Sequence, residues 1–176
     1  LQEVVTRTAQ LLAQWQAVGF CHGVMNTDNM SVLGLTLDYG PFQFVDGFDA
    51  HHICNHSDHT GRYAYSRQPQ IAYWNLFCLG QALLPLVGEP QDVVKVLETY
   101  KATFGQAQQT TTQRKLGLQT WQDADLQLQQ DLLTLLHSEH TDWTVFWRRL
   151  SQAMADGGRD FTPVQDLFID RAAWQA

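Results

Sequence analysis

HGVMNTDN at residues 22–29, followed by DYG at residues 38–40, is the stretch that most strongly determines how this chain folds. It places a carboxylate, Asp28, and a carboxamide, Asn29, together at the end of one loop. A second carboxylate, Asp38, stands nine positions after Asn29 and has a glycine two residues beyond it. Carboxylate and carboxamide oxygens are ligands that magnesium accepts.

The segment between these two motifs predicts a short hairpin. Residues 31–37 are mostly apolar or β-branched around Gly34, a pattern typical of two short strands joined by a turn. A tight hairpin brings Asn29 and Asp38 to the same end of the ribbon, where they can share one metal ion. The alternative is structural: Asn29 caps a turn, and residues 38–41 form a β-turn built from ordinary turn residues. The short motif alone does not decide between the two.

The same constellation serves kinase-like phosphotransferases, in which an asparagine and an aspartate hold magnesium against nucleotide phosphates. A further aspartate orients or deprotonates the attacking hydroxyl. Kinases place this base five residues before the metal-binding asparagine, where this chain has Val24, which cannot accept a proton. Asp28, beside Asn29, is the nearest acidic residue in the loop.

The surrounding sequence carries further motifs in a fixed order. They are HGVMNTDNMSVLGLTLDYGPFQFVD (22–46), HICNHSD (52–58), GRYAYS (61–66) and QPQI (68–71), which leads into WNL (74–76). This run resembles the selenoprotein O family, whose members look like protein kinases in fold, as pseudokinases, but transfer AMP to protein hydroxyl groups. The resemblance is dense over residues 19–84 and loose beyond them.

The resemblance implies roles for particular residues. Asp28 is expected to be the acidic catalytic residue, Asn29 and Asp38 the magnesium ligands, and Asp38 also a nucleotide-binding residue. The implied cofactor is Mg²⁺, with ATP as substrate and proteins with Ser, Thr or Tyr hydroxyls as acceptors, in the cytoplasm or, in a eukaryote, the mitochondrion. The alternative is a non-catalytic kinase-like binding scaffold. Val24 favours it, and the joint presence of the three polar residues opposes it.

Size and composition limit the other function classes. A length of 176 residues with 44% hydrophobic residues fits one domain with a packed core. The formal charge of −7 and the lack of a basic stripe exclude a nucleic-acid partner. Three cysteines are too few for a secreted disulfide framework. No apolar run is expected to span a membrane, because Gly80, Gln81 and Pro85 interrupt the nearest one, residues 76–87.

The periodicity predicts a mainly α fold with a small β-hairpin. An amphipathic helix runs from Leu1 to Gly19. A catalytic-type loop (20–30), a metal-binding hairpin (30–40), an activation-type loop (46–68) and a helical body (69–176) follow. Helices are expected at 71–87, 93–104, 126–136 and 143–154, with a stop at 157–158 and a last short helix starting at 162–163.

This order matches the C-terminal lobe of a protein-kinase-like fold. The N-terminal lobe is absent, because the chain has no glycine-rich phosphate loop and no strand lysine paired with a helix glutamate. The helical pattern is already under way at Leu1, which indicates a piece of a longer protein. We therefore expect the isolated chain to be inactive.

Several other side chains have both a structural and a functional interpretation. His51, His52, Cys54, His56, Asp58 and His59 are metal-capable, but one short loop rarely supplies four zinc ligands. Cys54 is either a redox switch in the whole protein or a small buried side chain. His22 is expected to brace the loop backbone, and the tryptophans to lie mostly in the core. The remaining group, Arg62, Tyr63 and Tyr65, either contacts substrate or closes the loop onto the body.

Overall fold

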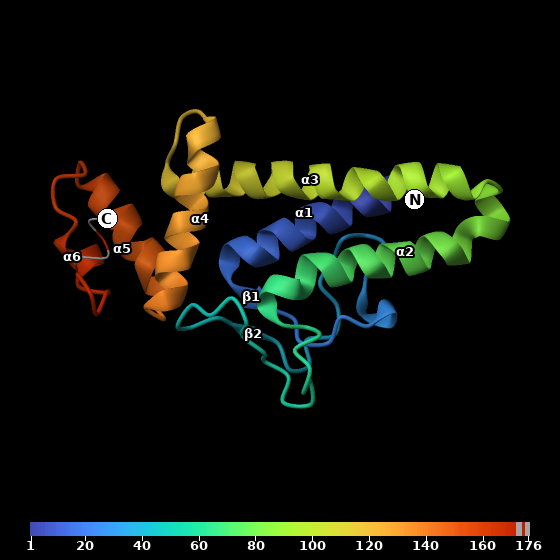
Figure 1. Ribbon diagram of the computed structural model, residues 1–176, viewed down its shortest axis with the longest axis horizontal. Coiled ribbons are helices and arrows are strands. Elements are labelled where there is room, and N and C mark those ends of the chain that lie inside the picture. Colours follow the sequence, from blue (N-terminus) through green and yellow to red (C-terminus); the bar gives the residue numbers. More distant parts are fainter. Residues whose placement is uncertain (172–173, 175–176) are drawn as a thin grey trace.

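The structure is a computed structural model that describes residues 1–171 and 174 of the chain (Figure 1). It is mainly helical, with one small two-stranded antiparallel sheet. The helices are α1 Gln2–Val18, α2 Gln68–Val87, α3 Pro90–Leu116, α4 Asp123–Ser138, α5 Trp143–Ala155 and α6 Thr162–Gln165. The strands are β1 Phe20–Cys21 and β2 Gln43–Phe44, and two single 3-10 turns are η1 Thr27–Asn29 and η2 Tyr65–Arg67.

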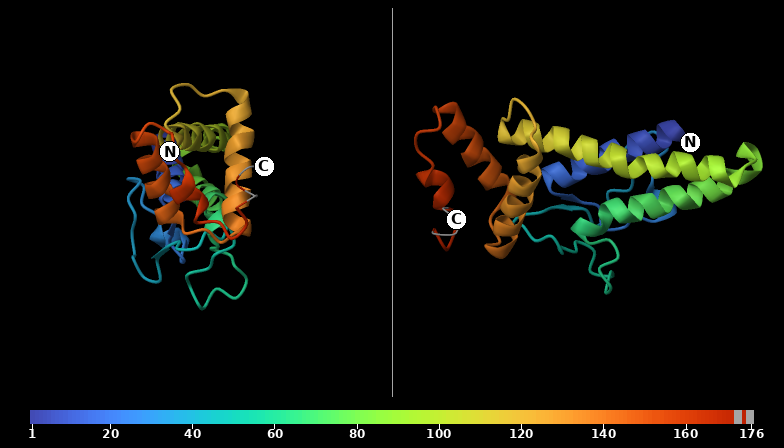
Figure 2. Two further views of the ribbon diagram at one scale, coloured as in Figure 1. Left: turned by 90° about the vertical axis from the view of Figure 1, so that its left-hand side faces the viewer. Right: turned by 45° about the horizontal axis from the view of Figure 1, so that its top comes forward.

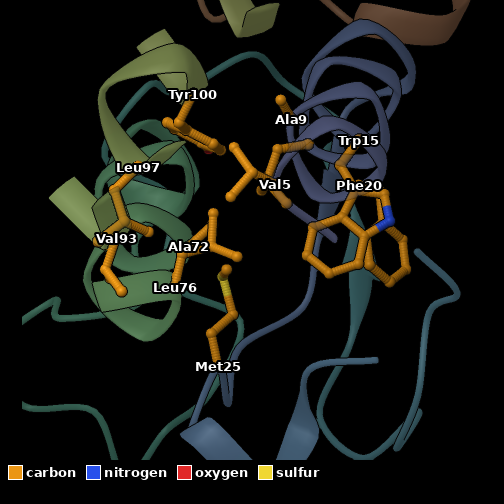
Figure 3. Close-up of a cluster of buried hydrophobic side chains, with 11 residues drawn as sticks. Val5, Ala9, Trp15, Phe20, Met25, Ala72, Leu76, Val93, Leu97 and Tyr100 are labelled. Atoms are coloured by element: carbon orange, nitrogen blue, oxygen red, sulfur yellow. The ribbon is translucent and has the colours of Figure 1, made fainter. Parts of the chain in front are cut away.

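The first three helices pack together around one hydrophobic core (Figure 3). α1 and α2 both lie along the long helix α3, and α4 to α6 gather at one end of this layer (Figures 1 and 2). The helices approach closely at Gly80, where an added Cβ would lie 2.7 Å from Cγ1 of Val93. The core comprises the buried side chains of Val5, Ala9, Leu12, Trp15, Phe20, Met25, Ala72, Leu76, Val93, Leu97 and Tyr100.

A second core lies between the loop after β2 and the helices α4 to α6. Its buried residues are Cys21, Val45, Phe48, Cys54, Tyr65, Leu136, Trp143, Phe146, Ala153, Val164 and Phe168. Strand β1 joins the two cores because successive strand side chains point to opposite faces: Phe20 enters the first core and Cys21 the second. The start of this loop is also tied to α5, since the backbone N–H of Trp143 donates to the Asp46 carbonyl at 2.8 Å.

The sheet differs from the predicted hairpin. β1 pairs with β2 in antiparallel register, Phe20 with Phe44 and Cys21 with Gln43, so the strands flank residues 22–42. Residues 31–37 contain no strand. A turn, in which Gly34 N–H donates to the Ser31 carbonyl at 3.1 Å, and a single antiparallel bridge from Met30 to Thr36 hold this segment instead.

The predicted helices are confirmed, with longer bounds for α2, α3 and α4, the last of which runs over Asp123–Ser138 rather than 126–136. α1 ends at Gly19, which takes the left-handed conformation (φ 72°) and lies against the Trp143 ring. α2 begins three residues before Ile71. α3 continues beyond residue 104 through a polar segment, where Thr110 and Thr111 return hydrogen bonds to the carbonyls four residues earlier.

Several large apolar side chains of the helices are exposed. On α2, Trp74 is 47% exposed and Phe77 is 42% exposed. Trp74 also departs from the expectation of core tryptophans, whereas Trp15 and Trp143 follow it. The leucine stripe of α4 buries Leu136 fully but leaves Leu126 53% exposed.

The expectation that no apolar run could span a membrane was wrong on length and composition. The helical run Tyr65–Val87 has 23 residues and a mean hydropathy of 1.2, which is enough by those two measures. Within it, the buried polar side chains of Gln68 and Asn75 bond to the backbone of the loop that follows β1. One side of it packs against α1 and α3, and 22% of its apolar window is buried inside the protein.

Lys115 connects three helices at the junction of the two cores. Its ammonium group donates to the Ala17 carbonyl at the end of α1 and lies over the rings of Trp143 (4.7 Å) and Trp147 (4.0 Å). A cation near a helix C-terminus and over indole faces is stabilised. Burial acts in the opposite direction and lowers the pKa of Lys115 to about 8.

Lys115→Met should therefore change how stability depends on pH. The unfolded lysine, with an ordinary pKa of 10.5, holds its proton at pH values where the folded lysine has lost it. Stability of the wild type should rise between pH 8 and pH 10, by about 1 kcal/mol relative to Lys115→Met, after allowance for partial exposure. Urea unfolding across this range measures the difference. Lys101→Met, at an exposed site on the same helix, is the control and should show no such trend.

Candidate functional site

Helix α2 holds the catalytic-type loop through two buried carboxamides. Oε1 of Gln68 accepts a hydrogen bond from His22 N–H, and Nε2 of Gln68 donates to the Phe20 carbonyl, both at 2.9 Å. Nδ2 of Asn75 donates to the Met25 carbonyl at 3.0 Å. The two amides are seven residues apart and so share one face of the helix. The loop is thus fixed near its start and at its middle.

His22 braces the loop from within, as the sequence predicted. It is 1% exposed, and Val24 N–H donates to its Nδ1 at 3.3 Å. The proton of the neutral ring therefore lies on Nε2, which donates to the Leu37 carbonyl at 2.7 Å. This bond links the loop directly to the segment that carries Asp38. Sequence and structure agree that His22 is a positioning side chain.

Asn29 and Asp38 lie on neighbouring segments. The isolated antiparallel bridge between Met30 and Thr36 brings the residue that follows Asn29 beside the segment that leads to Asp38. Asp38 has a positive φ of 54°, which is uncommon outside glycine, and its carbonyl accepts from Gly40 N–H at 2.8 Å. Backbone strain of this kind is often kept where function requires it.

The oxygen atoms of these residues suit a hard cation. Nδ2 of Asn29 donates to the Val24 carbonyl at 3.0 Å, so Oδ1 of Asn29 stays free to bind another group. The carboxylates of Asp28 and Asp38 are exposed and accept no hydrogen bond from the described residues. One or two such oxygens, completed by phosphates and water, form the usual magnesium environment. The donor set therefore fits Mg²⁺.

The histidine-rich loop does not assemble a zinc site. Among residues 1–171 and 174, no three His, Cys, Asp or Glu side chains gather closely enough to hold a metal ion. Nε2 of His52 bonds to Oε1 of Gln43 at 3.1 Å, and the His51 ring packs edge-on against His137. These side chains instead tie the loop to β2 and α4.

Two buried cysteines lie where this loop meets strand β1. The Cys54 thiol donates to the Cys21 carbonyl at 3.4 Å, and both residues are free and buried. A hydrogen bond between the two thiols raises the pKa of Cys21 and lowers that of Cys54. Burial fits the interpretation of Cys54 as a small core side chain. A redox role in the whole protein stays a prediction.

The activation-type loop closes onto the catalytic-type loop. Oδ1 and Oδ2 of Asp58 accept from the N–H groups of Arg62 and Tyr63 at 2.9 and 2.7 Å. Burial opposes ionisation of Asp58, but these N–H donors outweigh it and lower the pKa of the carboxyl group. The Tyr63 hydroxyl donates to Oδ1 of Asn26 at 2.5 Å. Tyr65 is buried, and its hydroxyl bonds to the Gln16 carbonyl on α1.

Sequence reasoning missed the two residues that position the loop. Gln68 and Asn75 were visible only as polar residues within an apolar helix. A buried amide must be hydrogen-bonded, so two amides seven residues apart on a core helix indicate a fixed backbone partner. That spacing was the available signal.

The chain matches known proteins along its whole length. Residues 1–170 match the family model described as protein adenylyltransferase SelO. The chain is 60% identical to the protein nucleotidyltransferase YdiU of Variovorax paradoxus and 57% identical to that of Albidiferax ferrireducens, in both cases over the full chain. It covers 35% and 36% of these two proteins. The chain thus spans about a third of the length of the curated relatives it matches.

Replacing Gln68 tests whether α2 holds the loop. Gln68→Leu leaves the buried His22 N–H and Phe20 carbonyl without partners, so unfolding should cost ~2–4 kcal/mol less than in the wild type. The His22 amide should also exchange with solvent faster. Gln70→Leu, at an exposed site on the same helix, is the matched control. Equal stability of the two variants in urea unfolding would show that the loop does not depend on Gln68.

Proposed function

Because this chain belongs to the SelO family of protein adenylyltransferases, we propose that the whole protein transfers AMP from ATP to hydroxyl groups of other proteins. The observation that carries the proposal is the pairing of the Asp28-Asn29 loop with the Asp38 segment through the Met30–Thr36 bridge. A loop mounted on a central helix, within a mainly helical body, also supports the C-terminal lobe of a kinase-like fold.

In this proposal Asp28 acts on the hydroxyl group of the acceptor protein. Its exposed carboxylate sits at the loop tip, where an incoming hydroxyl can reach it. The hydroxyl oxygen attacks the α-phosphorus of ATP and forms a new P–O bond. The bond from that phosphorus to the bridging oxygen breaks, and pyrophosphate leaves. The proton of the hydroxyl passes to Asp28, which acts as general base or orients the group.

Asn29 and Asp38 would hold Mg²⁺ through Oδ1 and the carboxylate. When bound, the ion supplies positive charge that offsets the phosphate charge. The Asn29–Val24 and His22–Leu37 hydrogen bonds fix the orientation of the two binding segments before substrate arrives. Prepositioned ligands reduce the reorganisation that the reaction requires.

The full-length protein would complete the nucleotide site. Seven large apolar side chains between residues 32 and 44 are exposed beside the Asp38 segment: Val32, Leu33, Leu35, Leu37, Tyr39, Phe42 and Phe44. Contiguous exposed apolar surface usually marks an interface. We expect the rest of the polypeptide to cover it and to supply the groups that bind the phosphates.

A non-catalytic kinase-like scaffold is the second candidate. The observation that favours it is Val24, which occupies the usual position of the base and is half-buried. The scaffold interpretation predicts nucleotide binding without transfer. It gives no reason for the free oxygens of Asp28, Asn29 and Asp38 to be held on neighbouring segments.

Two substitutions in the full-length protein separate the proposed roles. Asp38→Ala should weaken Mg²⁺-dependent ATP binding and abolish transfer, because a metal ligand is lost. Asp28→Ala should leave ATP affinity nearly unchanged and slow AMP transfer by about 100-fold or more. AMP incorporation from labelled ATP and calorimetric ATP affinity measure both effects. Asp123→Ala, on the exposed start of α4, is the control. Near wild-type transfer by Asp28→Ala would favour the scaffold.

The 176-residue chain alone should bind ATP weakly and transfer no AMP. It offers the proposed metal ligands but no glycine-rich loop for the phosphates. Calorimetry with Mg²⁺ and ATP should detect no micromolar binding, while circular dichroism confirms that the chain is folded. Micromolar affinity in this experiment would mean that the described residues already form the complete nucleotide site.

A further inference from the structure

We propose that Arg62, Tyr63 and Trp74 form an acceptor-docking surface that selects protein segments with an acidic residue near the modified hydroxyl. This inference rests on the proposed AMP transfer and names the class of acceptor that the site takes. It is carried by the contact of Tyr63 with the loop that holds Asp28, by the stacking of Arg62 on the Tyr63 and Trp74 rings, and by the free charge of Arg62.

The surface adjoins the catalytic-type loop. The Tyr63 hydroxyl donates to Oδ1 of Asn26, which lies two residues before Asp28. Trp74 precedes Asn75, the residue of α2 that holds the Met25 carbonyl of the same loop. The loop from β2 to α2, which carries Arg62 and Tyr63, protrudes from the helical body beside the start of α2 (Figure 1). A segment lying on this surface can therefore present its hydroxyl to Asp28.

The geometry of the surface is set in advance. The backbone N–H groups of Arg62 and Tyr63 are both held by the carboxylate of Asp58. The guanidinium carbon of Arg62 lies 5.0 Å from the centre of the Trp74 ring and 5.7 Å from that of Tyr63. Stacking on two rings restricts the guanidinium while leaving its N–H edges available to accept a carboxylate.

Among Arg7, Arg62 and Arg67, only the Arg62 guanidinium has no ion pair or hydrogen bond with the described residues. Arg7 pairs with Glu3 at 2.8 Å, and Arg67 donates to the carbonyls of Thr60 and Gly61. The Arg62 guanidinium forms no ion pair or hydrogen bond with the residues that the structure describes. The protein carries a formal charge of −7, so an unpaired cation next to Tyr63, which contacts the Asp28 loop, favours an anionic partner.

An exposed aromatic side chain one turn along α2 extends the surface. Trp74 is 47% exposed, and Phe77, three residues further on the same helical face, is 42% exposed. Aromatic and arginine side chains are the usual anchors of protein interfaces. The combination fits an extended polypeptide whose apolar parts lie on α2 and whose acidic side chain meets Arg62.

The test uses the full-length protein and synthetic acceptor peptides. The peptides share one central Ser, Thr or Tyr and differ only in flanking residues, which are Glu, Gln or Lys. The wild type should prefer the Glu-flanked peptide over the Gln-flanked one by about fivefold in kcat/KM, as one exposed charge pair allows. Arg62→Gln should lose this preference, and Arg62→Glu should favour the Lys-flanked peptide. The KM for ATP should stay unchanged in both variants.

Arg159→Gln, which removes an exposed arginine after α5, is the matched control and should keep the wild-type preference. An unchanged preference in Arg62→Gln would overturn the docking surface while leaving AMP transfer intact. A raised KM for ATP with no change in peptide preference would also overturn it, because Arg62 would then contact nucleotide phosphates. Absence of AMP transfer by the wild type would instead defeat the proposed function and this inference together.

Discussion

The buried carboxamide of Gln68 is the contact on which the site depends. It bonds to both the His22 N–H and the Phe20 carbonyl. Asn75, two turns further along the same helical face, donates to the Met25 carbonyl. Buried backbone groups need partners, so the loop cannot leave α2 without leaving these groups unpaired. An otherwise irregular loop thereby acquires the rigidity of a core helix, and Asp28 is presented from a fixed backbone.

The two hydrophobic cores hold this arrangement from opposite sides. The side chains of Phe20 and Cys21 are buried in different cores. Strand β1 is therefore anchored on both of its faces. Gly19 permits the sharp exit from α1 and allows the Trp143 ring to approach the backbone closely. Lys115 then ties the end of α1 to α5. The catalytic-type loop follows directly from strand β1, so a displacement of that strand would also displace the loop.

The local hydrophobic pattern of the sequence predicted most helices, but it did not predict the pairing of strands that lie far apart in the chain. The apolar period of α1 and its stop at Gly19 follow from the sequence alone. The strands β1 and β2 are two residues each and pair across more than twenty positions, a contact that no local period reveals. Strand propensity in residues 31–37 was overridden by the turn and bridge. The positioning role of Gln68 and the exposure of Trp74 needed tertiary structure, because each depends on what lies opposite the helix.

We propose that Asp28, Asn29 and Asp38 are held for transfer of a nucleotidyl group to protein hydroxyls. The most direct test supplies the full-length protein with Mg²⁺ and ATP labelled at either the α- or the γ-phosphate. Label from the α-phosphate should enter the acceptor protein, with release of pyrophosphate. Incorporation of the γ-label with release of ADP, or no incorporation of either label, would contradict the account.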